Sequence, residues 1–188
     1  GENNIMKIPF SPPDITEKEI EQVSEALRSG WITTGPKTKE LEREVADLCG
    51  VNRAVCLNSQ TACAEMTLRL LGVKEVITCA YTYTASASVV CHVGAKLILI
   101  DTQRDSLEMD YEQLENAITE KTKVIIPVDL GGVPCDYDRI FSIVESKKHL
   151  FHPENEIQKA IGRVIVMTDA AHAFGATWKG QPVGSVAD

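Results

Sequence analysis

Short apolar runs rich in β-branched residues alternate with helical patterns along most of the chain. The runs are continuously apolar instead of alternating in polarity, which is typical of strands covered on both faces. They predict strands at 54–58, 75–79, 96–101, 123–128 and 163–169. The patterns between and before them predict helices at 16–29, 38–49, 61–71, 84–93, 110–119 and 138–147. This order of elements predicts a three-layer αβα architecture of the α/β class, with a mainly parallel sheet.

Local signals refine some of these boundaries. Thr16 precedes the first helical pattern and Glu19 follows three residues later, which is the pattern of a capping box; Gly30 marks the helix end. The polar segment 152–158 contains Pro153 and predicts a loop with a short helix. Because no linker, repeat or low-complexity tract is visible, we expect one domain.

Charge and cysteine content exclude several classes of protein. The net charge of −8 argues against nucleic acid or an anionic membrane surface as a partner. No stretch approaches the roughly 20 apolar residues that span a bilayer. The N-terminus, whose residues 1–5 we leave out of the fold prediction, has no signal-peptide pattern. The six cysteines form no CxxC pair and no cluster with zinc-ligand spacing, which predicts a cytoplasmic protein without a metal site.

Ligands in an open parallel sheet bind beyond the carboxyl ends of the strands, so the residues after each run are candidates. The run 54–58 continues as NSQTAC, where Ser59, Thr61 and the free N–H groups of a helical turn suit a phosphate. An ordinary helix cap explains the same residues. After 75–79 come Tyr81 and Tyr83, which could cover a planar ring or simply pack.

Two further runs end on acids. Asp129 is followed by Gly131 and Gly132, which permit close approach to a ligand but also fit a tight turn. Asp169 is followed by His172, and this spacing places both groups on one face of a first helical turn. Asp169 is either a helix cap or the carboxylate of a ligand pocket. A turn that could bind a phosphate, an aromatic side chain that could cover a ring and a carboxylate, all at one sheet edge, together suit pyridoxal phosphate (PLP).

The chain resembles the DegT/DnrJ/EryC1/StrS family of sugar aminotransferases, which are PLP-dependent enzymes of the aspartate aminotransferase fold, fold type I. The resemblance is carried, in the family's order, by the segments IPFSPPDI, LRSGWITTGPKTKELEREVADLCGV, NSQTAC, YTYTASASVV, VGAKLILID, TKVIIPVDLGG, TDAAHAFGATWKG and VGSVAD. It implies that residues 1–188 contain an N-terminal segment and most of the PLP-binding large domain, truncated before the small C-terminal domain.

The resemblance also implies roles for individual residues. Asp169 would pair with the pyridine nitrogen and keep it protonated, and His172 would lie beside the ring hydroxyl, so both are catalytic candidates. Tyr83 would stack on the ring. The phosphate would be held by Ser59, Thr61 and Ala62. The substrate and a partner subunit would lie near the loop that contains Trp31, Thr33, Thr34 and Gly35.

Two departures from the family pattern limit what the chain can do. Gln60 stands where the family often has glycine, so the phosphate turn differs slightly. The family's Schiff-base lysine follows the position of Asp188, and no lysine of this chain matches its motif; Lys179 belongs to another position. We therefore expect residues 1–188 alone to be inactive and to bind PLP weakly or not at all.

The family implies that the full-length protein transfers an amino group, from glutamate, to a nucleotide-linked keto-sugar. It further implies a cytoplasmic homodimer that acts in cell-surface polysaccharide biosynthesis. Two alternatives are open. A PLP-dependent sugar dehydratase of the same family would carry histidine in place of the lysine, and a non-catalytic module with this fold would bind no cofactor even at full length.

Overall fold

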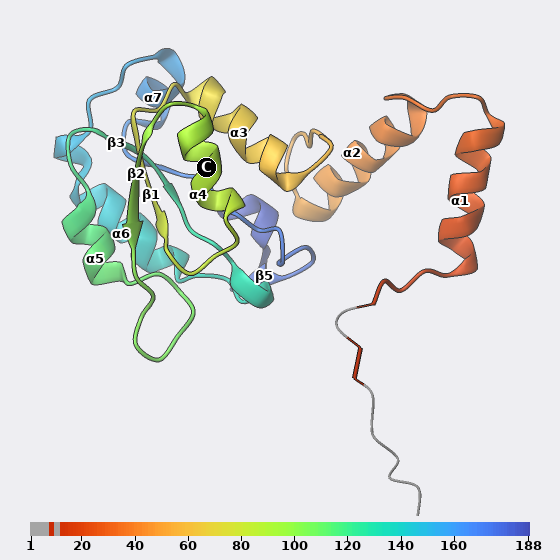
Figure 1. The fold of residues 1–188 in the computed structure, drawn as a ribbon. Coiled ribbons are helices and arrows are strands. Elements are labelled where there is room, and N and C mark those ends of the chain that lie inside the picture. Colours follow the sequence, from red (N-terminus) through yellow and green to blue (C-terminus); the bar gives the residue numbers. More distant parts are fainter. Residues whose placement is uncertain (1–7, 10–11) are drawn as a thin grey trace, which may run out of the picture. The chain divides into compact units, whose positions relative to one another are not determined.

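The computed structural model describes residues 8–9 and 12–188 (Figure 1). Residues 1–5, and Phe10 and Ser11 of the matching segment IPFSPPDI, lie outside the described residues. The chain divides into two compact units, 1–41 and 42–188, with a boundary inside helix α2 (Pro36–Cys49). The sequence, which indicated one domain, carries no compositional change at this point.

The first unit contains helix α1 (Glu17–Arg28). The capping box is confirmed: the Thr16 hydroxyl caps the first turn, and the Glu19 carboxylate accepts the Thr16 N–H at 2.6 Å. Gly30 follows the helix with a φ of +73°, in the left-handed region where glycine is favoured. The helix predicted at 16–29 therefore begins and ends as the local signals indicate.

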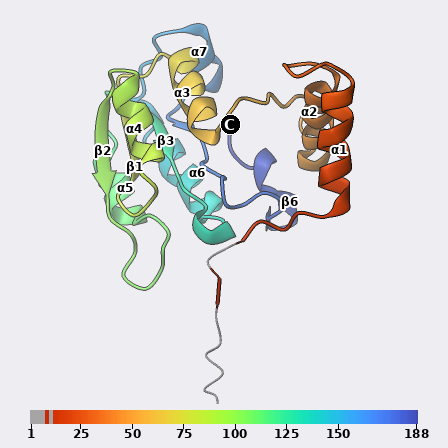
Figure 2. The same ribbon diagram turned by 45° about the vertical axis from the view of Figure 1, so that its right-hand side comes forward.

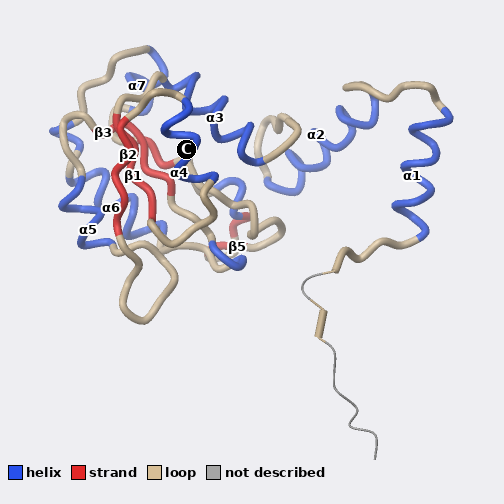
Figure 3. Tube along the Cα trace, in the orientation of Figure 1, coloured by secondary structure: helices blue, strands red, loops and turns tan. Residues whose placement is uncertain are grey.

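The second unit is built on a parallel sheet, whose strands are drawn in red in Figure 3, and the strand order is β2-β1-β3-β4. The strands are β1 (Glu75–Cys79), β2 (Lys96–Ile100), β3 (Thr122–Ile126) and β4 (Ile165–Val166). They are connected through helices α4 (Ala85–His92), α5 (Tyr111–Ala117), α6 (Tyr137–Ser146) and α7 (Glu156–Ile161). Helix α3 (Gln60–Leu71) precedes β1. Because the chain leaves β1 for β2 and then returns to the other side of β1, the strand order reverses between β1 and β3.

Two apolar clusters cover the two faces of this sheet. On one face, Val76 and Val124 pack with α3 and α4 in a cluster that includes Leu68 and Val89. On the other face, the strands pack with α5 and α6 through residues such as Ile77, Ile125, Leu114 and Ile140. Successive strand residues point to opposite faces, so Val76 and Ile77 contribute to different clusters. The predicted three-layer αβα fold with a mainly parallel sheet is confirmed (Figure 2).

The strand predicted at 54–58 is wrong. In the described part of the chain this segment pairs with no strand, and Val55 is 72% exposed. The Cys56 N–H donates instead to the Glu42 carboxylate at 2.9 Å. An extended apolar segment becomes a strand only where another strand offers backbone partners, and the sheet places none beside it.

The strand predicted at 163–169 is regular only at Ile165 and Val166. Its path continues through backbone hydrogen bonds from Met167 to Ile125 and from Asp169 to Pro127, so Asp169 still lies at the strand end. The strand predicted at 123–128 begins at Thr122 and ends at Ile126. A small antiparallel hairpin was missed, formed by β5 (Thr177–Trp178) and β6 (Gln181–Pro182).

The turn of this hairpin contains Lys179 and Gly180, with φ angles of +50° and +83°. Two-residue hairpin turns require such angles, and glycine at the second position is a usual signal for them. The Lys179 ammonium pairs with Asp138. Lys179 therefore belongs to an exposed hairpin turn.

Glu75 is a buried carboxylate at the amino end of β1, 2% exposed. Burial raises its pKa, but hydrogen bonds from Thr122, Lys96 and Thr119 outweigh this effect and hold the pKa below its ordinary value. A lowered folded-state pKa stabilises the fold above the unfolded pKa of about 4.3, and this contribution is lost as the pH falls through the folded value.

We therefore expect Glu75→Gln to lower the free energy of unfolding by about 1 kcal/mol at pH 7, and the difference from wild type to vanish in acid. Urea denaturation at a series of pH values measures this. The control is Glu115→Gln, because the Glu115 side chain is half exposed and lies 3.8 Å from Lys147. A Glu75→Gln difference that grows toward acid pH would contradict the assignment.

The described residues include no helix that is both long and apolar enough to cross a membrane. All six cysteines are free thiols. In residues 8–9 and 12–188, no group of three or more His, Cys, Asp or Glu side chains is placed to hold a metal ion.

Candidate functional site

A small pocket lies at the carboxyl ends of β1, β3 and β4, where the strand order reverses between β1 and β3. Open α/β sheets bind ligands at this kind of switch point. The loop after β1 contributes Thr82 and Tyr83. The pocket is completed by Val128, Asp129, Leu130, Asp169, Ala171 and His172. Three of the residues predicted from the sequence, Tyr83, Asp169 and His172, are thus brought together.

Asp169 is one of two buried acids that line this pocket, and it is 6% exposed. Its Oδ2 accepts the Ser86 hydroxyl at 2.7 Å, and its Oδ1 accepts the Ala171 N–H at 3.2 Å. No lysine, arginine or histidine of the described residues forms an ion pair with it. A buried carboxylate is stabilised by a cationic donor, so this site favours a ligand that presents a charged N–H.

His172 does not lie on a helix. The predicted helical turn after Asp169 is replaced by two tight turns, closed by hydrogen bonds from Ala173 to Ala170 and from Ala176 to Ala173. The Asp169 carboxylate caps the first of them locally, through the Ala171 N–H, so the helix-cap alternative is also wrong. His172 still lines the pocket, and its Nδ1 accepts the Gly131 N–H at 3.2 Å. The proton of the neutral ring therefore lies on Nε2.

Gly132, in the turn after β3, lies close to the backbone of His172. Its φ is +82°, and a Cβ atom built there would lie 3.1 Å from the His172 carbonyl oxygen. Gly131 also has a positive φ, of +64°, but a Cβ there would meet nothing within 4 Å. A comparison of alanine substitutions at these two glycines therefore separates the cost of backbone strain from the cost of a steric clash.

We expect Gly132→Ala to destabilise the protein by about 2 kcal/mol, and Gly131→Ala by about 1 kcal/mol, because only the first adds a steric clash to the left-handed strain. Thermal unfolding of both variants measures the difference. Equal losses would show that the approach of Gly132 to His172 does not constrain the turn.

The residues predicted to bind the phosphate lie outside the Asp169 pocket. Ser59 is the N-cap of α3, and its hydroxyl accepts the Ala62 N–H at 3.1 Å, as the helix-cap alternative predicted. Thr61 and Ala62 lie in the first turn of α3. None of these three lines the Asp169 pocket. They are N-terminal helix residues, where free N–H groups and the helix dipole favour an anion.

The substrate candidates lie in the first unit, where Trp31, Thr33 and Gly35 line a pocket of their own. The indole N–H of Trp31 donates to the Thr34 carbonyl at 3.1 Å. A Cβ atom at Gly35 would lie 2.0 Å from the Trp31 Nε1, so only glycine allows the indole to fold onto this loop.

Asp129 has a structural role. It is fully buried, and its carboxylate accepts the Cys135 N–H and the Tyr137 hydroxyl, each at 2.8 Å. Burial raises the pKa of this carboxyl above its ordinary value, against those hydrogen bonds. Its N–H donates to the Asp169 carbonyl at 3.0 Å, which joins the ends of β3 and β4.

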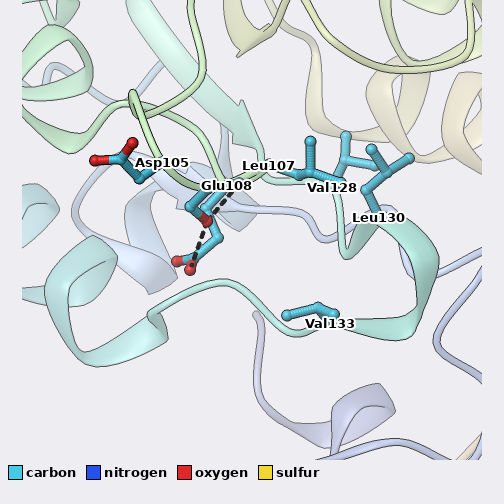
Figure 4. A pocket seen from close by; sticks show the side chains of 7 residues that line it. Asp105, Leu107, Glu108, Val128, Leu130 and Val133 are labelled. Carbon is cyan, nitrogen blue, oxygen red and sulfur yellow. Dashed lines mark hydrogen bonds between the residues drawn. The ribbon is translucent and has the colours of Figure 1, made fainter.

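A second pocket shares Val128 and Leu130 with the first and extends under the loop 105–108 (Figure 4). One of its two acids, Glu108, accepts hydrogen bonds from Ser106, Tyr111 and the Asp136 N–H. Because these donors belong to the surrounding loops and helices, the Glu108 carboxylate stabilises the loop itself.

Sequence reasoning missed Ser86 and Thr82. Both are hydroxyl residues of the segment YTYTAS, spaced by four positions, and they lie 3.1 Å apart. Ser86 is 1% exposed and binds Asp169. Their spacing is the only local signal that the sequence offers.

The DegT/DnrJ/EryC1/StrS aminotransferase family model matches residues 13–188. The structure superposes with a TM-score of 0.95 on Spr1654 from Streptococcus pneumoniae, which is assigned as a sugar aminotransferase. That protein was solved in a PLP form and in a pyridoxamine phosphate (PMP) form. The two proteins are 58% identical over 97% of this chain and 47% of that one.

Two curated relatives are also similar. The spore coat polysaccharide biosynthesis protein SpsC of Bacillus subtilis is 35% identical over 96% of this chain and 43% of its own length. The UDP-4-amino-4-deoxy-L-arabinose–oxoglutarate aminotransferase of Shewanella sediminis is 38% identical over 94% of this chain and 42% of its own length. The chain thus spans less than half the length of these relatives.

Proposed function

The chain belongs to the DegT/DnrJ/EryC1/StrS aminotransferase family, and we propose that it supplies the cofactor-binding domain of a PLP-dependent sugar aminotransferase. The observation that carries this proposal is the buried Asp169 carboxylate, which shares a pocket with Tyr83 and His172 and forms no ion pair among the described residues. The pyridine ring of PLP offers the N–H donor that such a carboxylate favours.

Three residues that line one pocket, Tyr83, Asp169 and His172, suit the pyridine ring of this cofactor. Asp169 would hold the ring nitrogen, Tyr83 would cover the ring, and His172 would lie at its hydroxyl. The N-terminal turn of α3 would bind the phosphate, through Ser59, Thr61 and Ala62. When bound, PLP withdraws electrons from the carbon that carries the amino group, which lets that carbon lose its proton.

Asp169 would supply the electrostatic part of this chemistry. An ionised carboxylate next to the ring nitrogen keeps a proton on that nitrogen, and burial strengthens the interaction because little water screens it. His172, fixed by the Gly131 N–H, would place its Nε2 proton as a donor within the same pocket. The loop of Trp31, Thr33, Thr34 and Gly35 would contact the substrate.

The substrate we propose is a nucleotide-linked keto-sugar, with glutamate as amino donor. The names of the Bacillus and Shewanella relatives support this, since one concerns polysaccharide synthesis and the other a UDP-sugar with oxoglutarate. A cytoplasmic homodimer that acts in cell-surface polysaccharide biosynthesis is part of the same proposal. Residues 1–188 alone would not transaminate, because no lysine in them matches the family's Schiff-base lysine.

The test is the donor half of the reaction. The full-length protein, loaded with PLP, is incubated with glutamate, and 2-oxoglutarate and PMP are measured. Stoichiometric formation of both is expected; a protein that binds no PLP would contradict the proposal. Addition of a nucleotide-linked keto-sugar should then yield the amino sugar with all its hydroxyl groups retained, whereas a dehydratase would return a deoxy-sugar.

A further inference from the structure

We infer that Ser86 is a positioning residue that fixes the Asp169 carboxylate for cofactor binding, an inference that rests on the proposed function. Ser86 lies in the first turn of α4 and is 1% exposed. Its hydroxyl donates to Asp169 Oδ2 at 2.7 Å, and its backbone N–H donates to the Tyr83 carbonyl at 3.3 Å. Ser86 therefore binds both the Asp169 carboxylate and the loop that contains Tyr83.

The direction of the hydrogen bonds follows from the chemistry of the groups. An ionised carboxylate only accepts, so the single hydroxyl proton of Ser86 goes to Asp169. The Thr82 hydroxyl, 3.1 Å from the Ser86 hydroxyl, must then be the donor in that contact. The hydrogen bonds are therefore donated in one direction, from Thr82 to Ser86 and from Ser86 to Asp169. Thr82 itself lines the pocket.

These hydrogen bonds restrict the rotation of the Asp169 carboxylate about its terminal torsion. The terminal torsion of an aspartate is broad and roughly two-fold, so the plane of the carboxylate is set by its partners. Both hydrogen bonds go to the same carboxylate, and the one from the Ser86 hydroxyl, at 2.7 Å, is shorter than the one from the Ala171 N–H, at 3.2 Å. Ser86 is thus the stronger of the two donors, and it fixes the carboxylate before the ligand arrives, which reduces the ordering cost of binding.

An ordinary helical role does not explain Ser86. Serine near a helix start usually bonds to the backbone of its own helix, as Ser88 does by donating to the Ala85 carbonyl at 3.3 Å. The Ser86 hydroxyl instead reaches Asp169, which is 83 positions away in the sequence. Ser88 is therefore a matched control, because it is a serine of the same helix without a contact to the pocket.

The experiment measures the dissociation constant of PMP from the full-length protein by equilibrium dialysis. Ser86→Ala should weaken binding about 10-fold, as expected for a lost hydrogen bond to a charged group. Ser86→Cys should weaken it similarly, because cysteine keeps the approximate shape and is only a weak donor. Ser88→Ala should change it less than about twofold. If Ser86→Ala fails to fold, as judged by circular dichroism, Ser86→Cys carries the test.

A double-mutant cycle separates positioning from general packing. If Ser86 acts through the carboxylate, Ser86→Ala should change PMP affinity less than about twofold in an Asp169→Ala background. A 10-fold loss that persists in that background would overturn the inference, as would equal behaviour of the Ser86 and Ser88 variants. A wild-type protein that binds no PMP would overturn the proposed function and this inference together; normal wild-type binding with an unaffected Ser86→Ala would overturn the inference alone.

Discussion

Replacing Asp169 by asparagine in the full-length protein will slow amino transfer about 100- to 1000-fold. Asparagine has nearly the same shape but no charge, so it cannot keep a proton on the ring nitrogen of the proposed cofactor. The loss should fall mainly on kcat, because the electrostatic stabilisation is needed while the substrate carbon loses its proton. Release of 2-oxoglutarate from glutamate, followed in single turnovers, measures this step directly.

The control for this variant is Asp138→Asn. Asp138 is an exposed acid whose partner is Lys179 in the β5–β6 turn, and it does not line the pocket. Its loss should leave the transfer rate within about twofold of wild type. An Asp169→Asn enzyme with a wild-type rate would show that this carboxylate does not act on the cofactor, and the proposed function of the pocket would fail with it.

The sequence was most informative about the layers of the fold. Hydrophobic runs such as 75–79 and 123–128 are local signals of strands covered on both sides, and parallel topology then places their carboxyl ends at one edge. That reasoning placed Tyr81, Tyr83 and Asp169 at one edge of the sheet, and the pocket there contains Tyr83 and Asp169. It required no knowledge of side-chain contacts.

Pairing across the sheet was less predictable. The run 54–58 has the composition of a strand, but a strand also needs a neighbour, and the sequence of a segment does not say which strand lies beside it. Similarly, Asp169 followed by Ala170 and Ala171 resembles a helix start, yet Gly175, with a φ of +83°, helps to turn the chain toward the hairpin instead.

Ser86 shows a limit of a different kind. Its chemistry depends on a carboxylate that is distant in sequence and on a neighbouring hydroxyl four positions before it. Asp129 is a similar case, since its partners Cys135 and Tyr137 follow a turn whose shape the sequence does not specify. Buried polar networks are satisfied by tertiary contacts, so local patterns reveal the residue types but not their partners.

The largest loss of stability is expected from Leu68→Ala, which should lower the free energy of unfolding by about 3 kcal/mol. Leu68 is fully buried and joins α3 to the sheet in the cluster with Val76 and Val124. Truncation removes this contact and leaves a cavity that rigid neighbours on the strands fill only in part. Urea denaturation monitored by circular dichroism gives the free energy directly.

Leu70 provides the control, because it is a leucine of the same helix with 65% of its surface exposed. Leu70→Ala should cost no more than about 0.5 kcal/mol, since its side chain gains little from folding. The comparison also tests the proposed site, because the amino end of α3 carries the phosphate candidates Ser59 and Thr61. If α3 is anchored by Leu68, PMP affinity should fall in Leu68→Ala and stay unchanged in Leu70→Ala. Equal losses of stability in the two variants would mean that a partner covers the outer face of α3 in solution.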